Sequence, residues 1–312
     1  MIALLLVPLL LPWFLPPLAR RTAARVRPEV ALGTITAASV VLAAGVVVCL
    51  GFLLLPLALT IPPVVALVHL VQPLRAGPVH LALGVSVLAA GTAAVIAVIV
   101  MRRGLAEAQR LRSAHGDIAH LPHAAGLCVL DDPRPDAYAL PGLKGPGRVV
   151  VTSGMLRSLD PGEREVLLVH ERAHLASRHY LFLAAAQLAG WCHPALAAVV
   201  PQVSFAAERA ADECAARATG SRALTARAVG RAALAASGGT GRAGGSVLVA
   251  RAVTGPVPAR VKALLAQAPA RRVAPALLAV ALLCSAAGAS SLAGAVWLHR
   301  GVEIAQGEHP AD

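Results

Sequence analysis

Aromatic and charged residues are scarce in this sequence. Only 3% of its 312 residues are Phe, Trp or Tyr, and only 14% are Asp, Glu, Lys or Arg, whereas 57% are hydrophobic. The mean hydropathy of +0.70 is far above that of an ordinary soluble globular protein. This composition excludes such a protein and indicates that a lipid bilayer is a partner of the chain.

Cysteine is scarce too, and no two cysteines form a C-x-x-C pair. The five are scattered over the chain: Cys49, Cys128, Cys192, Cys214 and Cys284. This pattern argues against a disulfide framework. Although the net charge is +12, the arginines gather at the ends of apolar runs and form no basic stripe with interleaved aromatics. We therefore expect no nucleic-acid binding.

Long apolar runs, in contrast, are abundant. Four of them predict transmembrane helices, at about Met1–Leu18, Val30–Leu59, Val79–Met101 and Val273–Leu298. The first could be read as a cleaved signal peptide, but its arginines follow the run and do not precede it. We expect a retained span.

The distribution of arginines predicts the orientation of these spans. Arg20, Arg21, Arg25 and Arg27 follow the first run, only Arg75 lies between the second and third, and several arginines follow the third. The positive-inside rule then puts the N-terminus outside and the chain after Met101 in the cytoplasm. We expect three spans in 1–101, a cytoplasmic domain in 102–272, a fourth span in 273–298 and a short external tail in 299–312.

The cytoplasmic domain is predicted to be helical with a small sheet. Strands are expected at Leu127–Leu130, Asp136–Gly142 and Arg148–Thr152. An edge of this sheet could hold an extended substrate, or the strands could be purely structural. The apolar stretch Leu181–Val200 is interrupted near its middle by Gly190–Pro194, which predicts a buried or membrane-hugging helical hairpin.

An H-E-x-x-H motif lies on a predicted helix that runs from Glu163 to about Tyr180, with Asp160 as its N-cap. His170 and His174 are four residues apart, so both imidazoles face the same side and can bind one zinc ion. Glu171 lies beside the ion without binding it. A catalytic zinc lowers the pKa of its water, and a neighbouring carboxylate can take the proton as the water attacks a peptide carbonyl. The alternative is an ordinary buried helix.

A third zinc ligand is expected on a later helix. Glu208 and Asp212 are four residues apart in an alanine-rich stretch and share one face. Glu208 could bind the metal while Asp212 accepts a hydrogen bond from a ligand histidine. A solvated acidic patch is the alternative. His179 is expected on another face of the motif helix, with no role as a ligand.

Together these residues resemble a known family. His170-Glu171-x-x-His174, Glu208-x-x-x-Asp212 and the upstream strands resemble membrane gluzincin peptidases, namely BlaR/MecR-type sensor-transducers and HtpX-like and CAAX prenyl proteases. The resemblance covers roughly Leu127–Leu265 and includes a basic element at Pro258–Lys262. It implies that His170, His174 and Glu208 bind zinc, that Glu171 is the catalytic base and that Asp212 supports a ligand.

Two positions depart from the family pattern. Asp136 stands where HtpX-like proteins usually have Asn. This difference concerns the assignment of Asp136–Gly142 as the strand that holds the substrate. Only His299–Asp312 follow the last apolar run, whereas the sensing members of the family carry a large extracellular penicillin-binding domain there. We expect no β-lactam sensor in that tail.

The sequence thus predicts a mainly α, multi-pass protein of the cell membrane, with about four transmembrane helices and a cytoplasmic zincin-like (gluzincin) α+β catalytic domain. The expected function is that of a zinc metalloendopeptidase that cuts protein substrates in regulatory, antirepressor-like proteolysis, with a cytoplasmic repressor as a candidate partner. HtpX-like quality control of membrane proteins and a non-catalytic signalling scaffold are the alternatives. The complete metal set and Glu171 argue against the scaffold.

Overall fold

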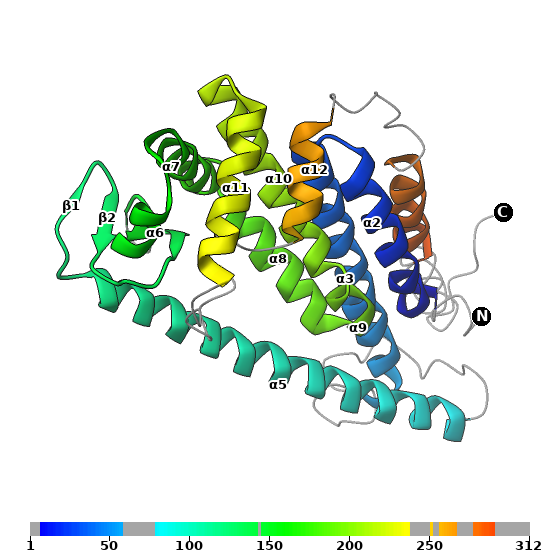
Figure 1. Ribbon diagram of the computed structural model, residues 1–312. Coiled ribbons are helices and arrows are strands. Elements are labelled where there is room, and N and C mark those ends of the chain that lie inside the picture. Colours follow the sequence, from blue (N-terminus) through cyan, green and yellow to red (C-terminus); the bar gives the residue numbers. More distant parts are fainter. Residues whose placement is uncertain are drawn as a thin grey trace.

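The computed structural model describes residues 7–58, 79–142, 145–237, 250–251, 256–266 and 277–290, which are mostly helical (Figure 1). In chain order the elements are η1 (Leu11–Phe14), α2 (Leu15–Arg25), α3 (Pro28–Ala58), α5 (Val79–Ile118), β1 (His123–Ala124), β2 (Leu127–Leu130), β3 (Ala137–Leu140), β4 (Arg148–Thr152), α6 (Ser153–Ser158), α7 (Pro161–Ala176), α8 (His179–Cys192), α9 (Pro194–Ala197), α10 (Val200–Thr219), α11 (Arg222–Ser237), β5 (Ala250–Arg251) and α12 (Val257–Leu265). A further apolar helix covers Leu277–Ser290.

The three predicted strands form, as β2, β3 and β4, within a five-stranded sheet of the order β1-β2-β4-β3-β5. Strand β2 runs parallel to β4, and β3 runs antiparallel to β4. Side chains that alternate along the strands face two different layers. Tyr138 and Val150 pack against the end of α5 at Ile118, whereas Ala137 and Val151 pack against α6, α7 and α11. The sheet is therefore held between α5 and the motif helix.

The outer edge of β3 is occupied by the chain itself. Tyr138 pairs with Arg251 and Ala139 with Ala250, both antiparallel. The sequence suggested that an edge of the sheet could hold an extended substrate. In the described residues β3 lies between β4 and β5, so it offers no open edge along these residues.

Among the described residues, two helices are long and apolar enough to cross a membrane, by length and composition: Pro28–Leu54 and Leu83–Ile118. They correspond to the second and third predicted spans. The described part of the first predicted span is divided between short helices, because prolines start η1 and α2. Of the fourth, the described part is Leu277–Ser290, a shorter helix; its remainder and the tail 299–312 lie outside the described residues.

Helix α5 is continuous over 40 residues and passes through the predicted domain boundary at Met101. Its apolar half exposes large side chains, with Leu88 73% and Met101 58% accessible. Its polar half reaches the sheet, as Figure 1 shows along the lower edge of the molecule. Residues Leu105–Arg112 lie within this polar half of α5.

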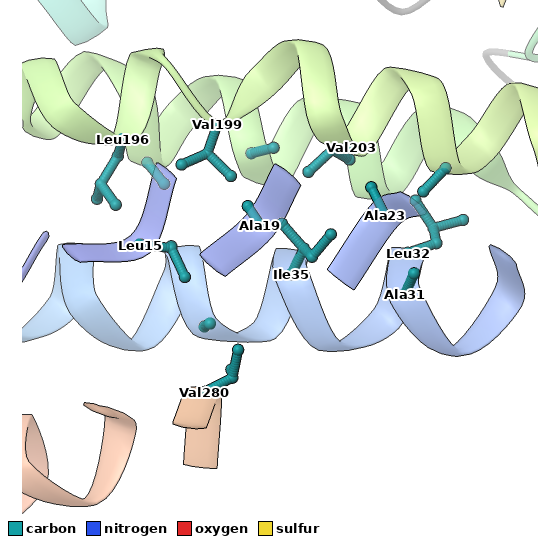
Figure 2. Close-up of a cluster of buried hydrophobic side chains, with 14 of the residues drawn as sticks. Leu15, Ala19, Ala23, Ala31, Leu32, Ile35, Leu196, Val199, Val203 and Val280 are labelled. Carbon is teal, nitrogen blue, oxygen red and sulfur yellow. The ribbon is translucent and has the colours of Figure 1, made fainter. Parts of the chain in front are cut away.

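The largest apolar core joins the first helices to the middle of the chain. Figure 2 shows α2 between α3 and the α9–α10 region, with Leu15, Ala19 and Ala23 facing Ile35 on one side and Val203 on the other. The stretch Leu181–Val200 folds as the predicted broken hairpin: α8 ends at Cys192, and His193 is extended before Pro194 starts α9. Its packing on α3 places this hairpin in the same core.

The start of α7 is fixed by charge. Asp160, the predicted N-cap, forms a capping box with Glu163, in which the Asp160 amide donates to Glu163 Oε2 at 3.0 Å. Glu163 is fully buried and pairs with Arg227 and Arg231 of α11, each at 2.9 Å. A buried carboxylate is tolerated only with such partners. The motif helix is thus anchored to α11 about two turns before the motif.

We expect Gly154→Ala to destabilise the protein by about 1–3 kcal/mol, because a β-carbon there would overlap the carbonyl oxygen of Pro133. Gly162→Ala is the matched control. Its β-carbon would meet Leu224 at an ordinary 3.6 Å, so it should be neutral or stabilising by about 0.4–1 kcal/mol. Chemical unfolding in detergent measures both. Equal stability of the two variants would contradict the close packing at Gly154.

Candidate metal centre

Two neighbouring helices bring the predicted site residues together. Helix α7 contributes His170, Glu171 and His174, and α10 contributes Glu208 and Asp212. All five are at most 3% exposed. Ligand atoms of His170, His174 and Glu208 lie within 4.8 Å of one another. The acidic pair on α10 is therefore buried against the motif helix, which excludes a solvated acidic patch.

The spacing of these atoms suits one small cation. The Nε2 atoms of His170 and His174 are 3.2 Å apart, and Glu208 oxygens lie 3.5 Å from the first and 3.6 Å from the second. Two atoms each 2.0–2.1 Å from a tetrahedral zinc would be roughly 3.3 Å apart. The nitrogen and oxygen donors and their separations thus fit zinc.

Glu171 is fully buried, and neither of its oxygens has a hydrogen-bond partner among the described residues. Burial raises its pKa to about 8, and the nearby Glu208 charge acts in the same direction. A buried polar group without a partner is uncommon outside functional sites. Glu171 is therefore available to a reactant at the metal centre.

Asp212 supports His170 from behind. Its Oδ1 lies 3.1 Å from His170 Nδ1, the ring atom that faces away from the ligand cluster. Burial lowers the pKa of His170, but the adjacent carboxylates of Asp212 and Glu208 outweigh it and raise the pKa to about 10. The two carboxylates thus favour positive charge at this place, either as a proton on His170 or as a bound cation.

His179 is placed differently from the prediction. Helix α7 ends at Ala176 and not near Tyr180, Arg178 takes a left-handed conformation with φ 50°, and His179 starts α8. Its Nδ1 lies 3.0 Å from Nδ1 of His174. The prediction that His179 occupies another face of the motif helix was therefore wrong. It contacts the outer nitrogen of His174 as Asp212 contacts that of His170, and no spacing rule of a single helix could have revealed it.

Arg260 of α12 completes the centre. Its Nε and Nη2 donate to the two oxygens of Asp212 at 2.8 and 2.7 Å, and its Nη1 lies 2.9 Å from Glu208 Oε2. Burial raises the pKa of Asp212, but the hydrogen bond and charge of Arg260 prevail and lower it to about 2. Sequence reasoning noted Arg260 only as part of a basic element.

Comparison with known proteins gives one match. The model of Peptidase family M48 matches residues 106–192, which include the sheet strands β1 to β4 and the motif helix but end before Glu208. No curated protein and no solved structure matches. The BlaR/MecR-type resemblance is therefore not confirmed at that level. The family match and the three-residue cluster together support a metallopeptidase of the M48 type.

Proposed function

We propose that this protein is an integral-membrane zinc metalloendopeptidase whose active site faces the cytoplasm. The observation that carries the proposal is the convergence of His170, His174 and Glu208 from two helices, with separations that fit a single zinc ion. The M48 match over the motif helix supports the peptidase assignment.

Each residue of the centre has a distinct role in this proposal. His170, His174 and Glu208 hold the metal, which when bound supplies a Lewis acid and an activated water. Glu171 accepts the proton of the attacking water and passes it to the leaving amine. Asp212 and His179 hold the rings of His170 and His174 through their outer nitrogens. A non-catalytic scaffold would not explain why Glu171 is buried with no hydrogen-bond partner among the described residues.

We also propose that the bilayer surrounds α3 and the apolar half of α5. The exposed valines and leucines of these helices would be costly in water and favourable in lipid. With the arginine distribution, this arrangement puts the catalytic domain on the cytoplasmic side. The substrate is then a cytoplasmic or membrane-tethered protein, and a repressor cut in regulatory proteolysis is our candidate.

The metal assignment predicts one zinc per chain in the purified protein, largely lost in His170→Ala or Glu208→Ala, because three protein ligands are needed to hold the ion. Glu165→Ala is the control, since this exposed glutamate of α7 lies outside the cluster. Elemental analysis in detergent gives the zinc content. Full zinc occupancy in both ligand variants would contradict the assignment of this site.

The proposed base predicts that Glu171→Gln still inserts in the membrane and still binds zinc, but cleaves a casein-like test protein about 100-fold more slowly or worse, because it cannot accept the proton. Proteomes of cells with the wild type and with this variant, compared side by side, would identify the substrates. Undiminished cleavage by Glu171→Gln would refute this mechanism, and a wild type that cleaves nothing would favour the scaffold.

The orientation predicts that reporters fused after Gly116 and after Gly307 give opposite signals, cytoplasmic for the first and external for the second, because one further span separates them. Compartment-specific enzyme reporters measure this in cells. The same compartment for both would mean that the segment around Leu277–Ser290 does not cross the bilayer.

A further inference from the structure

The largest fully buried side chain in the described part of the molecule is that of Arg260, 1% exposed. It comes from α12, a short helix that follows the motif by more than eighty residues in sequence. A buried guanidinium is costly unless several acceptors compensate it, and even a compensated buried ion pair often adds nothing to stability. Its position therefore calls for an explanation other than stability.

Arg260 contacts two carboxylates of the metal centre. The guanidinium contacts both oxygens of Asp212 and one oxygen of Glu208. Asp212 in turn contacts the outer nitrogen of His170. One side chain thus touches a ligand directly and reaches a second ligand through a single intermediate.

Arg260 is not what attaches α12 to the protein. Leu264, Val257 and Val261 pack into an apolar cluster with Ala216 of α10 and Val229 of α11. At the C-terminal end of α12, Arg222 donates to the carbonyl oxygens of Ala263 and Leu264 at 3.0 and 2.8 Å, and it pairs with Glu213. These contacts hold α12 in place without Arg260. The guanidinium of Arg260 therefore acts on the carboxylates of the centre.

Resting on the proposed zinc site, we infer that Arg260 is a positioning residue, which fixes the carboxylates of Glu208 and Asp212 so that Glu208 and His170 meet the metal in one geometry. Arginine suits this task because its rigid planar fork reaches three oxygens at once, which a lysine ammonium cannot do in the same arrangement. The metal centre is then built from α7, α8, α10 and α12, and it is incomplete without α12.

The charge of Arg260 and its positioning of the carboxylates would have opposite effects on zinc affinity. If Arg260 acted only through its charge, its removal would relieve repulsion of Zn²⁺ and tighten binding. If it positions the ligands, its removal weakens binding, since loss of a group that orients metal ligands typically costs about 10–100-fold in affinity.

The experiment compares full-length Arg260→Met and Arg260→Lys with Arg222→Met in detergent. Zinc dissociation constants come from competition with a chromophoric chelator, the geometry from the absorption spectrum of the Co²⁺-loaded protein, and fold integrity from thermal unfolding of the metal-free protein. We expect about 10–100-fold weaker zinc binding and an altered Co²⁺ spectrum in Arg260→Met. Arg260→Lys, which keeps the charge, should also bind more weakly, whereas Arg222→Met should bind as the wild type does.

Unchanged or tighter zinc binding in Arg260→Met would overturn the inference. An equal loss in Arg222→Met would overturn it too, because the effect would then come from loosening α12. If Arg260→Met does not fold, Arg260→Lys decides, and a wild-type affinity and Co²⁺ spectrum in that variant would reject the positioning role. Failure of the proposed function looks different: the wild type itself would bind no zinc, or would bind it as well after His170→Ala.

Discussion

The burial of ionisable groups between α7 and α10 is the constraint on which the rest of the structure depends. Glu171, Glu208 and Asp212 are all at most 2% exposed, and buried charges persist only where they are paired or bind a cation. Partner groups are supplied by helices that come later in the chain: His179 starts α8, and Arg260 lies on α12. The helices around the motif are therefore arranged so that their side chains can pair with the buried ionisable groups of the centre.

Much of the centre could be predicted from sequence because it depends on local rules. The spacing of His170 and His174, and of Glu208 and Asp212, follows from the helical repeat, and the start of α7 from its capping box. The roles of His179 and Arg260 depend on tertiary contacts. His179 reaches His174 only because Arg178 takes a left-handed conformation and ends the helix, and Arg260 is brought in by the packing of α12 on α11.

The predicted spans also agree with the structure only in part. Pro28–Leu54 and Leu83–Ile118 are uninterrupted runs of helix-compatible residues, so composition and structure agree. The first apolar run counts as a span by composition, but proline removes backbone donors and divides it into short helices. At the predicted domain boundary, Met101, the helix is not interrupted. Polarity changes there while no helix breaker follows, and α5 continues to Ile118.

The two halves of the centre are attached to different apolar helices. Helix α10 packs through Val203 and Ala206 on α2 and α3, and Arg209, next to Glu208, donates to the carbonyl oxygen of Ala23 at 2.6 Å. The sheet against which α7 packs rests instead on the end of α5. Helices α3 and α5 meet through a separate apolar cluster around Val46, Leu50 and Ala89. The distance between the histidine pair and Glu208 therefore depends on contacts made both at the centre and where the two long apolar helices pack together.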